Sequence, residues 1–351
     1  MNNSWSKLSA LRFTIEEVKR TGMSLEVSPV FKRHTTILQL TGHSQHGFGE
    51  DVVYETQDQQ AFQAATLPTL AGTYTLAEFS EKLDELDLFC GSPPTRSTSR
   101  DYRRWTFESA ALDLALKQNK LSLASALGRQ PMPLSYVISL GLGRPPSAAP
   151  VLERLARQSG MQFKLDADQA WDKELCSALA ATGAVQTVDL KGYYTGTPVD
   201  LDADPALYQL VAETFPTAWI EDPVLNGETL AVLAPHSNRI SMDAPIHRIE
   251  DLAQFPIELR CVNIKPSRSG RLQDLLNLVE HCEQNAISMY AGGQFELGVG
   301  RRQVQHLASL FHADGCNDCS PVSFHTATLK DEWPSSPLPV PAQTPGLGLK
   351  D

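Results

Sequence analysis

The sequence predicts an α/β protein in which a (β/α)8 barrel of the TIM type follows an N-terminal α+β domain. Three observations lead to this prediction. The chain has 351 residues, which is more than one ordinary domain needs. Its first ~130 residues place strands before helices, as α+β domains do. From residue 134 onward, eight short apolar runs alternate with helical segments, and eight such units make a barrel.

The expected boundaries follow from these changes of pattern. We expect the N-terminal domain over residues 1–130, the barrel over 131–325 and a proline-rich tail over 326–351. The prolines between Trp333 and Leu349 favour a segment that is disordered or lies extended over the surface. We assign no chemistry to this tail.

The N-terminal domain begins with strands between about residues 13 and 55. Thr35–Leu40 is rich in β-formers, and Gly47–Gly49 supplies a turn before the next strand. Helices are expected over Leu76–Leu88 and Trp105–Gln118, and the second is rich in Ala and Leu, which suits close packing.

The barrel region is predicted from alternating strands and helices. The strands are expected at Ser135–Leu140, Met161–Leu165, Val185–Leu190, Ala218–Glu221, Arg239–Asp243, Cys261–Ile264, Ile287–Tyr290 and, more weakly, Asp314–Cys319. The helices are expected at Val151–Ser159, Asp172–Thr182, Pro205–Thr214 and Arg271–Asn285. The first strand is not followed by G-x-G-x-x-G, so a Rossmann fold has little support.

Composition excludes two classes of partner. The formal charge is −11 and the pI is near 5.3, whereas surfaces for nucleic acids or anionic membranes need clustered Lys and Arg. We see no signal peptide and no run of 18 apolar residues, and six cysteines are too sparse for a disulfide framework. We therefore expect a cytoplasmic protein that acts on a small molecule and is able to form a homo-oligomer.

Carboxylates end three consecutive predicted strands. Asp189, Glu221 and Asp243 are separated by 32 and 22 residues, and Lys265 follows after 22 more. The carboxyl ends of barrel strands converge, so these side chains would meet, and three anions so close need a cation among them. Oxygen ligands suit Mg²⁺. Lys164 and Lys265, on the flanking strands, would lie on either side of the metal. Both are candidate catalytic bases, because a nearby divalent cation lowers the pKa of an amine. Each residue alone has an ordinary structural explanation, but the regular spacing argues against that for the set.

Five segments resemble the enolase superfamily, specifically its muconate lactonizing enzyme-like branch within the mandelate racemase/muconate lactonizing enzyme family. The resemblance covers roughly residues 25 to 325, and the chain resembles a divergent member of the branch. This branch includes o-succinylbenzoate synthases and dipeptide epimerases. The similar segments are Gly47–Glu50, Phe107–Ala115, Trp219–Pro223, Val262–Gly270 and Gly293–Arg301. The most specific is Lys265–Gly270, which places a lysine on strand six.

The resemblance implies an enolase-like barrel whose N-terminal domain caps the barrel mouth. It implies that Asp189, Glu221 and Asp243 bind Mg²⁺, and that Lys265 acts as a base, an acid or a stabilising cation. The implied chemistry is removal of a proton α to the carboxylate of a small carboxylic acid. The resulting enediolate would lead to an isomerase reaction (cycloisomerase or epimerase) or a lyase reaction (dehydratase, similar to o-succinylbenzoate synthase).

The resemblance also implies where substrate specificity lies. The capping loops near residues 28–33 and 45–48 would contribute to it, with Phe31 in the first of them. Gln294 and Glu296, after strand seven, are further candidate substrate-binding residues.

Two positions depart from the branch. It carries Lys-x-Lys on strand two and Asp-x-Asn on strand three, whereas this chain has Lys164-Leu165-Asp166 and Asp189-Leu190-Lys191. Our hypothesis is that Lys191 replaces the missing strand-two lysine, because residues i and i+2 of a strand share a face, and that Asp166 pairs with it. Alternatively, Asp166 is itself the acid/base or an extra metal ligand. The letters of residues 165–171 also resemble the family's metal-ligand motif. However, only one barrel strand precedes this segment, so Asp166 falls on strand two, and we favour Asp189 as the first ligand.

Two rival functions remain. One is a degenerate, non-catalytic barrel with a binding or scaffolding role. The other is a hydrolase with histidine ligands at its strand ends, but His247, His281 and His306 fall in predicted loops or helices, where we expect them to be exposed.

Overall fold

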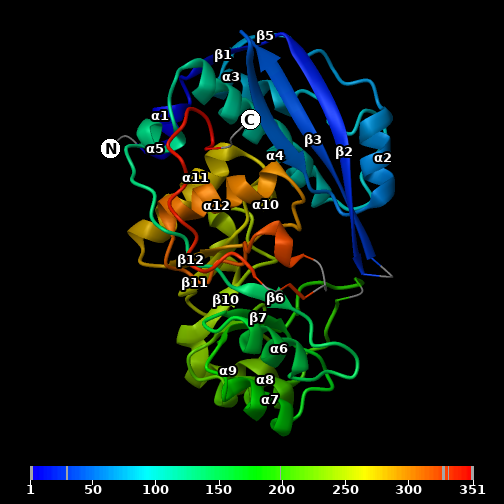
Figure 1. The fold of residues 1–351 in the computed structure, drawn as a ribbon, viewed down its shortest axis with the longest axis vertical. Helices are drawn as coiled ribbons and strands as arrows, with labels where there is room; N and C mark the ends of the chain where they lie inside the picture. Colours follow the sequence, from blue (N-terminus) through cyan, green and yellow to red (C-terminus); the bar gives the residue numbers. More distant parts are fainter. Residues whose placement is uncertain (1–2, 29–30, 198, 326–328, 331, 349–351) are drawn as a thin grey trace.

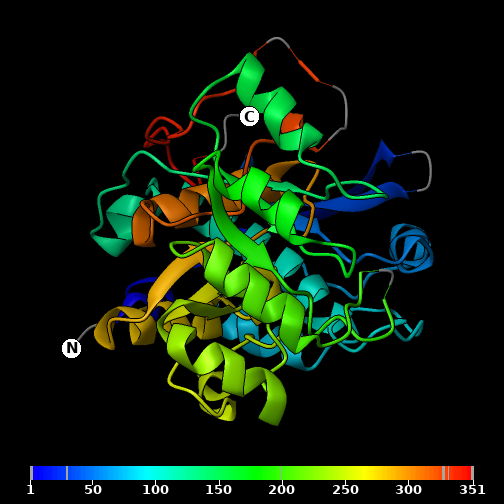
Figure 2. The same ribbon diagram turned by 90° about the horizontal axis from the view of Figure 1, so that it is seen from below.

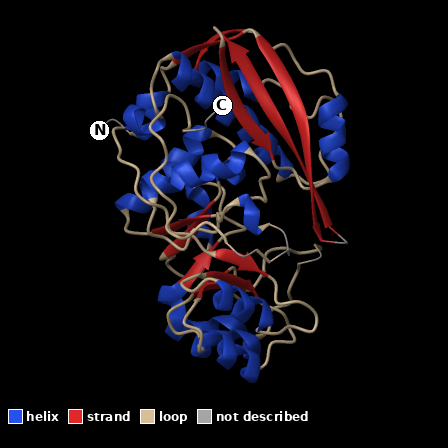
Figure 3. Cartoon of the chain, in the orientation of Figure 1, coloured by secondary structure: helices blue, strands red, loops and turns tan. Residues whose placement is uncertain are grey.

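The fold was analysed in a computed structural model that describes residues 3–28, 31–197, 199–325, 329–330 and 332–348. Figures 1 and 3 show two parts: an N-terminal part with a long antiparallel hairpin, and a barrel region below it whose strands are surrounded by helices. The predicted fold class is confirmed.

Within the described residues, the N-terminal part contains two small sheets and five helices. Its elements are α1 (Ser4–Leu8), β1 (Arg12–Ile15), β2 (Glu17–Ser28), β3 (Phe31–Gly42), β4 (Gln45–Asp51), α2 (Thr56–Ala64), β5 (Gly72–Thr75), α3 (Leu76–Asp84), α4 (Ser99–Gln118) and α5 (Leu123–Leu127). Strands β2, β3 and β4 form an antiparallel sheet, and β1 pairs with β5. Helix α4 begins at Ser99, six residues before the predicted start.

Strand β4 lies directly against helix α4 because its two glycines leave room. A Cβ at Gly47 would collide with the carbonyl oxygen of Ala110, and one at Gly49 with that of Thr106. The turn predicted at these glycines lies instead just before β4, so the glycines serve close packing.

The barrel region contributes seven parallel strands within the described residues. They are β6 (Ile138–Leu140), β7 (Phe163–Asp166), β8 (Val185–Asp189), β9 (Trp219–Glu221), β10 (Ile240–Met242), β11 (Cys261–Ile264) and β12 (Ser288–Ala291), and they are neighbours in chain order. The helices are α6 (Ala149–Arg157), α7 (Lys173–Ala180), α8 (Pro205–Thr214), α9 (Gly227–Leu233), α10 (Pro266–Ser269), α11 (Leu272–Gln284) and α12 (Val299–Phe311), with 3-10 helices η1 (Ala234–Arg239), η2 (Ile249–Gln254) and η3 (Val322–Phe324). Figure 2 shows barrel helices around the strands.

The eighth strand position is filled by a segment that closes the barrel through isolated bridges. Asn317 bridges Tyr136 and Asp318 bridges Gly292, both in parallel, so this segment joins the first strand to the last. The prediction of a regular strand at Asp314–Cys319 was wrong in this respect. The physical reason is Asn317, whose side chain takes over backbone hydrogen bonds: its Oδ1 accepts from Ala291 N at 2.7 Å and its Nδ2 donates to Ser135 O at 2.9 Å.

The described part of the tail lies against both parts of the chain. Trp333 and Leu347 are buried, and the backbone N–H of Leu347 donates to Asp113 Oδ1 on α4 at 2.9 Å. Leu338 forms an antiparallel bridge with Leu134, before β6. Of the two expectations for the tail, disorder or an extended path over the surface, its described part follows the second, and buried side chains anchor it. Among the described residues, no helix has the length and apolar character needed to cross a membrane.

We predict that replacing Asn317 with alanine weakens closure of the barrel. The variant would leave the buried N–H of Ala291 without its acceptor, so we expect a loss of about 2–3 kcal/mol in the free energy of unfolding. Urea denaturation measures this loss. Asn238→Ala, at an exposed position in η1, is the matched control and should change stability by less than about 0.5 kcal/mol. Equal stability of the two variants would contradict the closing role of Asn317.

Candidate functional site

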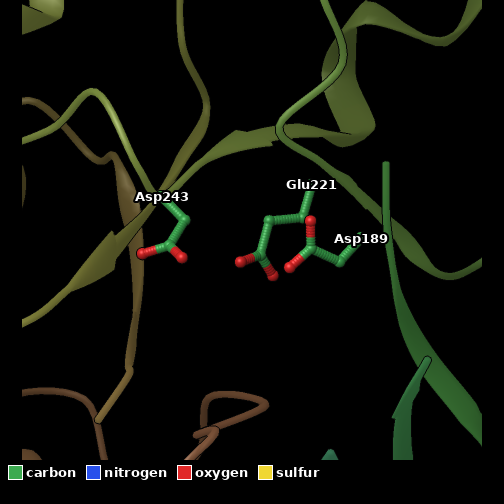
Figure 4. A group of neighbouring side chains, drawn as sticks. All are labelled: Asp189, Glu221 and Asp243. Atoms are coloured by element: carbon green, nitrogen blue, oxygen red, sulfur yellow. The ribbon is translucent and has the colours of Figure 1, made fainter. Parts of the chain in front are cut away.

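Three buried carboxylates meet at the carboxyl ends of β8, β9 and β10. Asp189 and Glu221 are the last residues of adjacent strands and lie opposite each other in register, and Asp243 directly follows β10. All three are fully buried, and each offers an oxygen within 4.8 Å of those of the other two. Figure 4 shows the three side chains side by side, with Glu221 between Asp243 and Asp189.

Lysines lie at both ends of this row of carboxylates. Lys164, on β7, places its Nζ 2.6 Å from Glu221 Oε1 and 3.0 Å from Asp189 Oδ2. At the other end, Lys265 Nζ lies 2.7 Å from Asp243 Oδ2. Room for Lys265 comes from Gly292, where a Cβ would collide with the lysine Cε.

Lys191 and Asp166 form an ion pair beside the first carboxylate. Lys191 Nζ is 2.9 Å from Asp166 Oδ1 and 2.6 Å from Asp189 Oδ2. Strand β8 ends at Asp189, and Lys191 has φ +53°, so the turn rather than strand alternation directs its side chain. The two residues that depart from the family pattern are therefore in contact.

The surroundings raise the pKa values of Lys164 and Lys191 but lower that of Lys265. Burial acts to lower the pKa of Lys164, but Asp189, Glu221 and Asp318 outweigh it and raise the pKa well above its ordinary value. Burial likewise opposes the charged form of Lys191, whose pKa is nevertheless raised by its carboxylate neighbours. For Lys265, burial together with the positive charges of Arg268 and Lys164 lowers the pKa, against the opposing effect of Asp243.

Several supporting residues were missed by the sequence analysis. Arg268 Nη1 bonds Asp243 Oδ1, and the Tyr194 hydroxyl donates to Asp243 Oδ2 at 2.9 Å. Asp222, at φ +51°, accepts the backbone N–H of Asp243 at 2.7 Å, and burial with the nearby negative charges of Asp243 and Asp189 raises its pKa to about 7. Asp318 Oδ2 lies 3.4 Å from Lys164 Nζ. Of these, Asp222 and Arg268 lie in segments that resemble the family, Trp219–Pro223 and Val262–Gly270, whereas Tyr194 and Asp318 carried no such signal.

The arrangement fits a divalent cation. Glu221 Oε2 is buried and has no hydrogen-bond partner among the residues that the structure describes. Burial raises the pKa of Glu221 well above its ordinary value, and the negative charges of Asp189 and Asp243 add to this. Counting the contacts above, six carboxylates face three lysines and one arginine, so two negative charges remain in excess when all are ionised. A cation with oxygen ligands would balance them.

The candidate substrate-binding residues lie where the N-terminal domain meets the loop after β12. Gln294 donates from Nε2 to the Tyr102 hydroxyl at 3.1 Å. Glu296 is buried, with Oε2 3.0 Å from Arg301 Nη2, so its carboxylate already has a cationic partner. Phe31 is 36% exposed and its ring makes an edge contact with that of Phe295.

Two buried side chains of the N-terminal domain hold this same loop. Arg33 donates to the carbonyl oxygens of Gln294, at 2.9 Å, and Phe295, at 3.2 Å. Glu50 accepts the backbone N–H groups of Leu297, Gly298 and Gly300, so it caps the start of helix α12 from another domain. The motif Gly47–Glu50 therefore joins the two parts of the protein.

Histidines do not contribute to the carboxylate cluster. Among the described residues, the cluster whose side chains could hold a metal ion consists of Asp189, Glu221 and Asp243. The expectation of an exposed His306 was wrong: it is 1% exposed within α12, and its ring Nδ1 bonds the carbonyl oxygen of Leu347. The tail covers the face of α12 that carries His306, and the hydrophobic periodicity of the helix does not predict this contact.

The comparison with protein families places the chain. The family described as "Domain of unknown function (DUF8230)" matches with its N-terminal domain over residues 6–126 and its C-terminal domain over residues 130–326. The chain belongs to this DUF8230 family. The two matched domains meet within a few residues of the junction between α5 and β6.

Curated relatives carry enolase-superfamily names. An o-succinylbenzoate synthase from Bacillus subtilis (strain 168) is 28% identical over 218 residues, which are 58% of this chain and 55% of the relative. An N-succinylamino acid racemase from Thermus thermophilus is 27% identical over 299 residues, 80% of this chain and 76% of the relative. The chain thus spans about half the length of the first of these relatives.

Solved structures share the fold. A dipeptide epimerase from Methylococcus capsulatus, complexed with Mg ion, aligns with a TM-score of 0.71 and 22% identity over 95% of this chain and 99% of the other. A muconate cycloisomerase from Pseudomonas fluorescens gives a TM-score of 0.68 and 16% identity, covering 97% and 96% of the two chains. The resemblance to the enolase superfamily is confirmed by these relatives and structures.

We predict that Glu50→Gln loosens the loop at the start of α12. The amide keeps one acceptor oxygen but loses the charge that three backbone N–H groups share, so we expect the free energy needed to open this segment to fall by about 1–3 kcal/mol. Hydrogen exchange of the amides of residues 297–300 should become faster. Glu17→Gln, on the exposed strand β2, is the control. Unchanged exchange at residues 297–300 in Glu50→Gln would show that the cap does not hold the loop.

Proposed function

We propose that this protein is a Mg²⁺-dependent isomerase or lyase that removes the proton α to the carboxylate of a small organic acid. The observation that supports it most is the row of Asp189, Glu221 and Asp243, with lysine ammonium groups at both ends. The fold and the names of the relatives agree with this chemistry.

Asp189, Glu221 and Asp243 would hold the metal. When bound, Mg²⁺ would supply positive charge to the substrate carboxylate as its negative charge grows. Lys164, in contact with two of these carboxylates, orients them and offsets part of their mutual repulsion. Arg268 and Tyr194 hold Asp243 from the other side.

Lys265 and Lys191 are the proposed proton-transfer residues. Lys265 lies at the Asp243 end and Lys191 at the Asp189 end, so the two can approach a substrate from different sides. Asp166 positions Lys191 through their ion pair. Gln294 and the capping residue Phe31 are proposed to contact the rest of the substrate, and Glu296 to shape the loop through Arg301. The names of the relatives point to N-succinylamino acids and dipeptides as first compounds to test.

We predict that Mg²⁺ stabilises the folded protein. A ligand at about 100 times its Kd adds about 2.7 kcal/mol to the free energy of unfolding, and this is readable as a concentration-dependent rise of Tm. Glu221→Gln should lose the Mg²⁺-dependent rise, whereas Glu228→Gln, an exposed position in α9, should keep it. A wild-type Tm that does not respond to Mg²⁺ would overturn the metal site and favour a non-catalytic barrel.

We predict that the two lysines are both needed for exchange of the α-proton with solvent deuterium. In D₂O with Mg²⁺ and N-succinylamino acids or dipeptides, followed by NMR, Lys265→Ala should abolish exchange and Lys191→Ala should slow it by about 10²-fold or more. Lys173→Ala, exposed at the start of α7, controls for loss of a surface charge. Full exchange in Lys191→Ala together with none in Lys265→Ala would assign the second role to Asp166.

A further inference from the structure

A cavity of about 300 Å³ lies apart from the carboxylate site, between the N-terminal domain and the barrel. The N-terminal domain lines it with the end of α3, the turn that follows and the first turns of α4. The barrel lines it with residues around η2, α10 and the start of α11. This volume is at the lower end of the range for small-molecule sites.

Part of the cavity lining is apolar. Leu83, Leu88 and Phe89 belong to this part, and all three are at least nine-tenths buried. These side chains belong to the core of the N-terminal domain, so this part of the lining is preformed. A ligand's hydrocarbon or aromatic body could lie against it without exposing new surface.

Four arginines line the rest of the cavity, and two of them are already neutralised. Arg104 from α4 and Arg271 from the barrel both pair with Asp84 Oδ1. Arg104 also bonds Glu108 Oε1 at 3.0 Å and the Ser80 carbonyl oxygen at 2.6 Å. These contacts join the two domains and fix one corner of the cavity.

The other two arginines are exposed and have no ion pair within the described part of the chain. They are Arg100 from α4, whose guanidinium lies 5.8 Å from the centre of the Phe89 ring, and Arg248 at the start of η2. Two further carboxylates line the cavity: Asp101, whose Oδ2 is 3.2 Å from His247 Nδ1, and Asp274. Four guanidinium groups and three carboxylates line the cavity, and Glu108, the partner of Arg104, balances the fourth positive charge. Arg100 and Arg248 are thus the two guanidinium groups of the described lining that are free to pair with an anionic ligand.

We propose that this cavity binds a small organic carboxylate, with its anionic group between Arg100 and Arg248 and its apolar body against Leu83, Leu88 and Phe89. The planar guanidinium fork matches carboxylate geometry, and the two arginines come from different domains. A bound anion would therefore add a further link between the domains at this cavity, beside those through Asp84 and Asp101. Helix α10 separates this site from the carboxylate cluster: Ser269 lines the cavity, whereas the preceding Arg268 contacts Asp243.

The test uses benzoate as the probe and benzamide as its neutral counterpart, with the full chain and without added metal. Isothermal titration calorimetry should show one benzoate per chain and no comparable binding of benzamide. Arg100→Gln and Arg248→Gln should each weaken benzoate binding at least tenfold. Both positions are exposed, so folding should be unaffected, and circular dichroism checks it. Arg260→Gln, an exposed arginine paired with Glu258 outside the cavity, is the matched control and should bind as the wild type does.

A second variant separates this site from the proposed metal site. Glu221→Gln should retain benzoate binding, because Glu221 does not line the cavity. Absence of benzoate binding, equal binding of benzamide, or unchanged affinity in both arginine variants would each overturn the proposal. Loss of benzoate binding in Glu221→Gln alone would place the anion at the barrel mouth instead. None of these outcomes bears on whether Mg²⁺ binds.

Discussion

The mutual repulsion of three buried carboxylates is the constraint on which the rest of the barrel mouth depends. Asp189, Glu221 and Asp243 are fully buried and lie within 4.8 Å of one another, where anions are costly unless positive charge lies among them. Much of the surrounding structure supplies that charge or makes room for it. Lysines take both ends of the row, and a glycine opposite Lys265 leaves space for its side chain. The proposed Mg²⁺ would balance the two negative charges that remain in excess when all six carboxylates of the site are ionised.

The parts of this site that follow from strand ends could be predicted from the sequence. Apolar periodicity located the barrel strands, and β11 has the predicted bounds, Cys261–Ile264. Because the carboxyl ends of parallel strands converge in a barrel, carboxylates at successive strand ends are expected to lie close together. Asp189 and Glu221 do lie opposite each other on adjacent strands. The contact between Lys191 and Asp166 was also within reach, because exchanged residue types at neighbouring positions suggest a pair.

Features that depend on contacts distant in sequence could not be predicted. Arg268 reaches Asp243 from the helix after β11; it lies in the similar segment Lys265–Gly270, but the sequence does not show which carboxylate it contacts. Asn317 replaces a regular eighth strand because its side chain satisfies backbone groups of other segments. His306 is buried by a tail that composition alone describes as extended. The direction of Lys191 comes from a positive φ at the turn, which strand alternation does not anticipate.

The cap that Glu50 places on α12 has a consequence for the order in which the chain is made. Glu50 leaves the ribosome first, and its amide partners follow 247 to 250 residues later. Through nearly all of synthesis its carboxylate has none of them, so it must stay hydrated or protonated rather than buried. The N-terminal domain can pack α4 against β4 early, because those contacts are local to it. The face that receives α12 is completed only when the last helix of the barrel arrives, which makes docking of the two parts a late event.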